Sequence, residues 1–164
     1  MNTGQTILTI IAIVFLGTNV VSVNRTFLQH GAILQQTEIG LFGSSIATSL
    51  IEEAQGKAFD KNSLEGYLQT TSECSPVDSL GPEPGEKRTD WNDFDDYNKL
   101  NDTVKIKDVD TFYRWATVTY VDSTNPNVAT NYRTFCKSMT VHVRGRSSQD
   151  TVSMTYLFSY WSFR

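Results

Sequence analysis

The feature that most constrains this chain is an uninterrupted apolar stretch close to its first residue. Residues 6–23, TILTIIAIVFLGTNVVSV, contain no charged side chain, and the first charge in the chain is Arg25. As a helix with a rise of about 1.5 Å per residue, the stretch would extend roughly 27 Å, close to the thickness of a bilayer core. It therefore predicts a signal peptide, a membrane anchor or a helix that packs against copies of itself.

The sequence argues against a cleaved signal peptide. Such a peptide has a positively charged start, a short apolar stretch and a cleavage site between small residues. Residues 1–5, MNTGQ, carry neither Lys nor Arg, and the apolar stretch runs on into a second, amphipathic one. A lone anchor helix and an oligomerisation helix both stay open at this point.

The amphipathic continuation extends the predicted helix far beyond the apolar stretch. Its apolar residues recur at steps of three and four, the helical period. They are Phe27, Leu28, Ile33, Leu34, Leu41, Phe42, Ile46, Ala47, Leu50 and Ile51. The pattern ends near Gln55, which predicts one helix within residues 1–55, from about residue 4 to residue 55 and roughly 75 Å long. These residues do not fall on one narrow stripe, which favours contacts with neighbouring copies.

Residues 56–164 predict a globular head. Within it, residues 73–102 hold three of the four prolines and an excess of acidic over basic side chains, which is typical of a long irregular loop. From Thr103 to the end the apolar pattern changes to a period of two, which predicts an antiparallel meander over 103–164. The expected strands are 103–107, 112–121, 132–143 and 151–163. The C-terminal half of the helix is the apolar surface available to cover one face, so the predicted fold class is α+β.

Composition and motifs exclude several classes of function. The net charge of −4 argues against nucleic-acid binding. With two His and no Cys-x-x-Cys pair, a structural zinc site is not expected. The chain contains no nucleophile elbow, P-loop or Gly-x-Gly-x-x-Gly motif. We therefore do not expect an enzyme.

The two cysteines, Cys74 and Cys136, lie far apart in the sequence. In an exported protein, an even pair is interpreted first as a disulfide. Closing a loop of about 60 residues would stabilise the fold by roughly 4 kcal/mol in the chain-entropy description. Two buried free thiols are the alternative.

The loop over residues 73–102 gathers hard oxygen ligands within nine residues. They are Asp90, Asp93, Asp95, Asp96 and Asn98. Ca²⁺ takes about six to eight oxygens from such loops, although the spacing is not that of an EF-hand. A calcium site is one interpretation, and no other cofactor is expected. The alternatives are a solvated acidic surface, or pairing with basic residues of the same or a neighbouring subunit. The basic residues of the C-terminal strands are Arg133, Lys137, Arg144, Arg146 and Arg164.

The order of these segments resembles the architecture of the type IV pilin and pseudopilin family over the whole chain. That family begins with a basic leader ending in Gly, followed by an apolar residue and then a Glu at the fifth mature position. Gly4 stands in the place of the leader Gly, but Gln5 follows it, Thr9 stands where Glu is expected, and no Lys or Arg precedes Gly4. Residues 90–98 also resemble an acidic stretch of some minor pilins.

The resemblance implies a structural subunit of an extracellular filament on a prokaryotic cell surface. Such a subunit is inserted in the membrane before a pilus assembly machinery polymerises it through its N-terminal helix. Arg25 and Glu38 are candidates for charge pairs between subunits, or they face solvent. The implied polymerisation core is Ile7, Leu8, Ile10, Ile11, Ile13, Val14, Phe15, Leu16, Val20, Val21, Val23, Phe27 and Leu28. The alternative function is a single-pass, membrane-anchored extracytoplasmic binding module.

Overall fold

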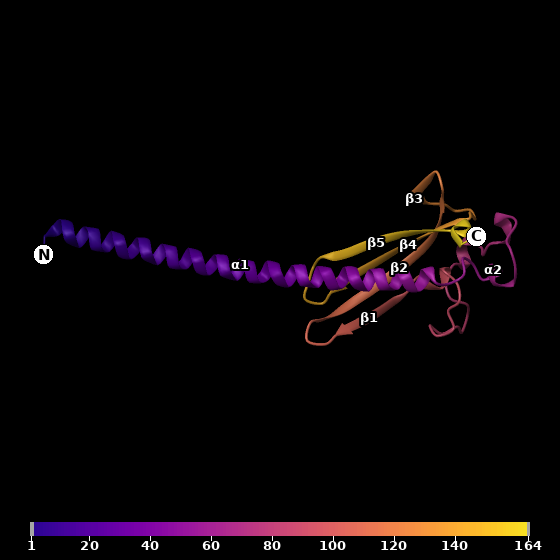
Figure 1. Ribbon diagram of the computed structural model, residues 1–164, viewed down its shortest axis with the longest axis horizontal. Coiled ribbons are helices and arrows are strands. Elements are labelled where there is room, and N and C mark those ends of the chain that lie inside the picture. The colour runs from indigo at the N-terminus through magenta and orange to yellow at the C-terminus, as the bar shows by residue number, and fades with distance from the viewer. Residues whose placement is uncertain (1, 164) are drawn as a thin grey trace. The chain divides into compact units, whose positions relative to one another are not determined.

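The computed structural model describes residues 2–163, and side-chain burial for residues 2–161. It confirms the α+β fold class (Figure 1). The long helix α1 (Thr3–Gln55) matches the expected one, and a four-residue helix, α2 (Asn62–Glu65), follows it. The chain divides into two compact units, Met1–Glu38 and Ile39–Arg164, with the boundary inside α1. Each unit is described by itself below.

The second unit contains an antiparallel sheet. Its strands are β1 (Asn101–Ile106), β2 (Asp110–Asp122), β3 (Asn125–Ala129), β4 (Cys136–Gly145) and β5 (Thr151–Ser159). Strands β1, β2, β4 and β5 lie side by side in that order, and β3 pairs with the end of β2. The sequence does not predict β3, because Asn-Pro-Asn is turn chemistry and a proline is tolerated only at the edge of a sheet. Three 3-10 turns precede the sheet, η1 (Thr71–Glu73), η2 (Val77–Ser79) and η3 (Asp95–Tyr97), and a fourth, η4 (Tyr160–Phe163), follows it.

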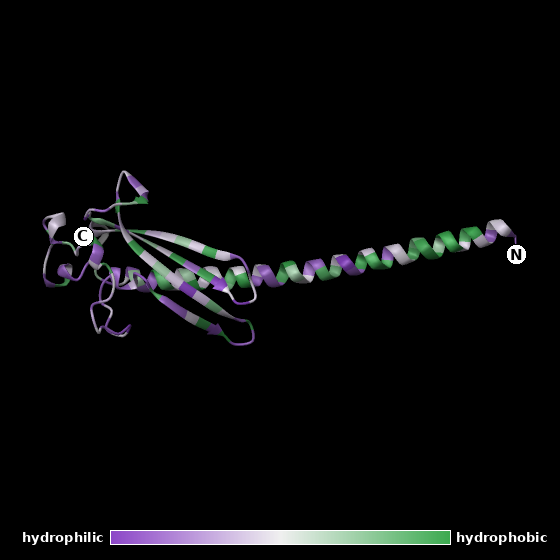
Figure 2. Cartoon of the chain, turned by 180° about the vertical axis from the view of Figure 1, so that it is seen from behind, coloured by the Kyte–Doolittle hydropathy of each residue, from purple (hydrophilic) through white to green (hydrophobic). Residues whose placement is uncertain are grey.

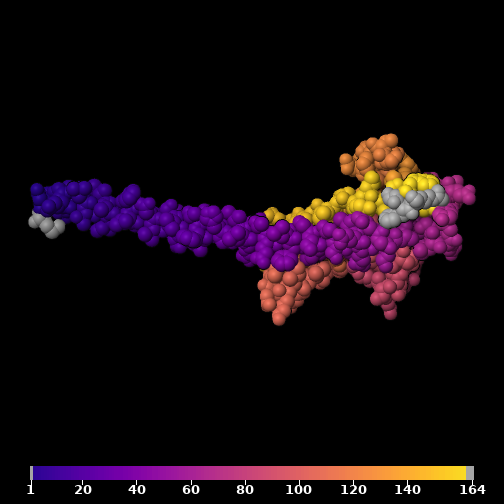
Figure 3. Space-filling model, viewed as in Figure 1, coloured from indigo at the N-terminus to yellow at the C-terminus, as the bar shows by residue number. Residues whose placement is uncertain are grey.

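The part of α1 from Ile39 onward covers one face of this sheet. Ala47 and Leu50 are fully buried, and they belong to one apolar core with Val118, Met139 and Val141 of the strands. In the space-filling view, this part of the helix lies between β5 on one side and the β1–β2 hairpin on the other (Figure 3). Alternation in the strands and helical periodicity in α1 thus place both apolar faces against each other, as the sequence predicts.

The tightest approach of helix to sheet is at Gly145, the last residue of β4. A Cβ added there would lie 2.7 Å from Cγ2 of Ile39 and 3.0 Å from Oδ2 of Asp110. We expect Gly145→Ala to lower the free energy of unfolding by about 1–3 kcal/mol, because a packed core cannot accept the extra carbon without strain. Urea denaturation of the full chain in detergent, followed by circular dichroism, measures the change.

Gly40→Ala is the matched control for this substitution. Gly40 lies inside α1, and a Cβ there would meet nothing within 4 Å. Ala at that position should stabilise the helix by up to about 1 kcal/mol through its higher helix propensity. A Gly145→Ala variant as stable as the Gly40→Ala variant would contradict the observed packing of α1 on β4.

Candidate functional site

The first unit presents apolar side chains around the whole circumference of α1. At about 100° per residue, positions 7, 8, 10 and 13 already point to different sides of the helix. Figure 2 shows the N-terminal part of this helix coloured mostly as hydrophobic, whereas hydrophilic and hydrophobic colours alternate further along it. Every residue of the expected polymerisation core, from Ile7 to Leu28, is more than half exposed in the single chain. By length and composition α1 can cross a membrane, and none of its most apolar window is buried.

Three polar side chains of this apolar stretch donate hydrogen bonds to backbone carbonyls of their own helix. The hydroxyl of Thr9 donates to the carbonyl of Gln5 at 2.8 Å, and Thr18 and Asn19 both donate to the carbonyl of Phe15, at 2.9 Å and 2.7 Å. These bonds lower the cost of transferring the side chains into lipid or into an apolar bundle of helices.

Arg25 and Glu38 follow the apolar stretch and are both exposed. Among the residues that the structure describes, neither forms an ion pair. Pairing between subunits and exposure to solvent therefore both stay open for these two side chains.

In the second unit, β4 carries a lysine, Lys137, whose side chain has no exposed surface. Its Nζ donates to the carbonyl of Phe59 at 2.7 Å, to Oδ2 of Asp60 at 3.0 Å and to Oδ1 of Asp95. An ammonium group has three donors, so all of them are used. The acidic loop thus pairs with a basic residue of the C-terminal strands inside one subunit, as one of the alternatives predicted. Arg164, another of those basic residues, lies outside the described residues.

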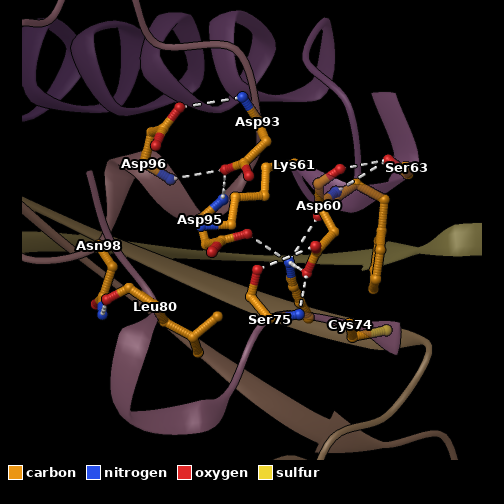
Figure 4. Close-up of polar contacts among 12 residues, drawn as sticks. Asp60, Lys61, Ser63, Cys74, Ser75, Leu80, Asp93, Asp95, Asp96 and Asn98 are labelled. Atoms are coloured by element: carbon orange, nitrogen blue, oxygen red, sulfur yellow. Dashed lines mark hydrogen bonds and ion pairs between the residues drawn. The ribbon is translucent and has the colours of Figure 1, made fainter. Parts of the chain in front are cut away.

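Asp60 connects three segments of the head (Figure 4). Its Oδ2 accepts the backbone N–H of Ser75 at 2.8 Å as well as the ammonium of Lys137. Burial alone would raise the pKa of Asp60, but Lys137 and the N–H donors outweigh it and hold the pKa below its usual value. For Asp95, burial outweighs the attraction of Lys137, and the pKa is raised. The network therefore joins the segment after α1, the acidic loop and β4.

The five residues expected to bind calcium are not brought to one point. Asp90 is exposed, and the amide of Asn98 donates to the carbonyl of Leu80 and accepts the N–H of Val118. Oδ1 of Asp93 accepts the backbone N–H groups of Asp95 and Asp96. Burial, followed by the nearby carboxylates of Asp95 and Asp96, raises the pKa of Asp93 to about 8. Many side-chain oxygens of the acidic loop thus accept hydrogen bonds that hold the loop and the head together (Figure 4).

Two acidic residues that the sequence analysis did not single out lie beside Asp96. Glu83 and Glu86 each bring a carboxylate oxygen into a group in which all three ligand atoms lie within 4.8 Å of one another. They precede the expected cluster in the same loop, on either side of Pro84 and Gly85. A Glu-Pro-Gly-Glu turn is the only sequence signal that the two carboxylates share one side of the loop.

The expected disulfide is not formed, and Cys74 and Cys136 are free thiols. Cys74 is buried, and its Sγ–H donates to the carbonyl of Thr134 at 4.0 Å. Burial raises the pKa of the Cys74 thiol to about 11, which leaves little thiolate for oxidation at neutral pH. An even cysteine count predicts pairing but carries no information on which way each sulfur points.

Comparison of the chain with protein-family models, with curated proteins and with solved structures finds no match. The chain is an α+β protein whose N-terminal helix is long and apolar enough to cross a membrane.

Proposed function

We propose that this protein is a structural subunit of a pilus-like filament, polymerised through the apolar part of α1. The observation that carries the proposal is the exposure of large apolar side chains beyond residue 23. Phe27, Leu34 and Leu41 are exposed by 74%, 70% and 68%. A span of about 20 residues crosses the bilayer core, so a single membrane crossing does not cover these side chains. Neighbouring copies of the same helix would cover them.

The two parts of the helix contribute differently to the free energy of assembly. Residues 6–23 exchange lipid for other helices at little cost, because both environments are apolar. Phe27, Leu28 and Leu34 lie beyond that stretch, and each gains about 25 cal/mol per Å² of apolar surface that a neighbour removes from water. Gly17 and Gly31 have open space around them in the single chain. Small residues of this kind allow helices in a bundle to approach closely.

Negative-stain electron microscopy of the purified protein, and of filaments sheared from the source cells, tests the proposal. We expect ordered filaments built of this chain, with mass spectrometry identifying its N-terminus. A double variant, Phe27→Ser with Leu34→Ser, should lose filaments and still insert into membranes, because residues 6–23 are unchanged. Leu64→Ser is the matched control: Leu64 is an exposed apolar residue of the head, and its loss should leave filaments intact.

The opposite result would favour the membrane-anchored binding module. In that case the wild-type protein stays monomeric in detergent micelles and no surface filament contains it. The double variant would then behave as the wild type does in every assay of assembly.

A further inference from the structure

The loop between α1 and β1 brings three carboxylates together at one place. Glu83 and Glu86 face each other across a turn in which the N–H of Glu86 donates to the carbonyl of Glu83 at 3.0 Å. One oxygen from each lies within 4.8 Å of a carboxylate oxygen of Asp96, the central residue of η3. Glu83 and Glu86 thus bring oxygen atoms close to one from Asp96, which lies ten or more positions further along the loop.

The carboxylate of Asp96 supplies a second, independent observation. The residue is only 1% exposed. Its Oδ2 accepts the backbone N–H groups of Asn92 at 2.8 Å and Asp93 at 3.1 Å. Its Oδ1 is buried and has no hydrogen-bond partner within the described part of the chain. Burying a carboxylate oxygen without a hydrogen-bond partner costs free energy, and a bound cation would offset that cost.

Glu83 and Glu86 line a surface cavity, and the group of three carboxylates has an excess of negative charge. Lys61 and Asn92 also line this cavity. The ammonium of Lys61 lies 2.7 Å from Oε1 of Glu83 and is the one cation paired with these three carboxylates among the described residues. Lys61 is itself about half exposed, so an ion of higher charge can displace it into water.

We propose that Glu83, Glu86 and Asp96 form a binding site for Ca²⁺. Carboxylate oxygens are the hard ligands that Ca²⁺ prefers, and water from the cavity would complete its coordination. Mg²⁺ demands near-ideal octahedral geometry and gives up its water reluctantly, whereas Ca²⁺ accepts flexible sets of oxygen ligands. A set of three carboxylates from an irregular loop therefore favours Ca²⁺ over Mg²⁺. The bound ion would tie the Glu83–Glu86 turn to η3, which also carries Asp95 of the buried Lys137 network.

Calcium titration of the full chain in detergent micelles, after treatment with EDTA, tests the site. We expect isothermal titration calorimetry to give a Kd of about 10⁻⁴–10⁻³ M, the range of extracellular modules. Glu86→Gln should weaken binding at least tenfold. Asp90→Asn is the matched control, because Asp90 is an exposed carboxylate of the same loop outside the group, and its Kd should change less than twofold. Lys61→Gln should tighten binding severalfold by removing the competing ammonium.

Asp96→Asn is not used alone, because Asp96 also accepts two backbone N–H groups and its loss can unfold the loop. Circular dichroism confirms that each variant is folded, and a Ca²⁺-dependent rise of the Tm gives a second readout. The proposal is overturned if folded wild-type protein shows neither heat nor a Tm shift with Ca²⁺. It is equally overturned if Glu86→Gln binds as the wild type does, if Asp90→Asn loses binding, or if Mg²⁺ binds as tightly as Ca²⁺.

Discussion

Replacing Lys137 by methionine should lower the free energy of unfolding of the head by about 3–5 kcal/mol. Methionine fills a similar volume but donates no hydrogen bond, so Asp60 and Asp95 would be left facing each other without a cation in a site closed to water. A domain of this size has a total stability of about 5–15 kcal/mol, so this single change removes a large share of it. Urea denaturation of the full chain in detergent, monitored by circular dichroism, measures the loss.

Two further variants make this result specific to the buried ion pairs. Lys105→Met removes a lysine from the exposed side of β1 and should change stability by less than about 0.5 kcal/mol. Adding Asp95→Asn to Lys137→Met removes one of the uncompensated charges, so the double variant should recover at least about 1 kcal/mol. A Lys137→Met protein as stable as the Lys105→Met control would mean that the network contributes nothing to the folded state.

The contacts of the buried Lys137 show which features of the head the sequence predicts and which it does not. Strict alternation from Phe135 to Val143 places Lys137 on the same face as Met139 and Val141, so the pattern predicts a lysine on an apolar face. Its partner Asp60 lies 77 positions away in an irregular segment. No periodic signal connects the two. Only the fold shows that the parallel bridge between Ala58 and Asp93 brings both segments beside β4.

The acidic loop shows why candidate ligands are harder to predict than helices and strands. The elements α1, β2, β4 and β5 could be predicted because burying one face of a helix or strand requires apolar residues at a regular period along its whole length. In the loop, composition identifies a region rich in oxygen, but each carboxylate is directed by local backbone geometry. Gly85 has a φ of 89°, and its turn brings Glu86 toward Asp96, while Asn98 is drawn away to β2. Such turns have no periodicity from which a ligand set can be derived.

A charge in the middle of the apolar part of α1 should abolish both membrane insertion and filament assembly. Val14→Asp places a carboxylate near the centre of residues 6–23, where a charged residue costs about 2.5–3.5 kcal/mol on insertion scales. That cost corresponds to a fall of roughly 100-fold in the inserted fraction. The cost recurs at every subunit of a filament, so assembly suffers more than insertion. Carbonate extraction of membranes and negative-stain microscopy measure the two effects separately.

Val14→Leu is the matched control and should behave as the wild type, because it keeps the side chain apolar. The Tm of the head should stay unchanged in Val14→Asp, since the core of the second unit begins at Ile39. Normal filaments of the Val14→Asp protein would contradict the proposed role of the apolar stretch. If Val14→Asp loses insertion and filaments while the Phe27→Ser, Leu34→Ser variant loses filaments alone, the helix has two separable parts. Residues 6–23 then hold the subunit in the membrane, and the apolar side chains beyond them provide the driving force that draws it into the polymer.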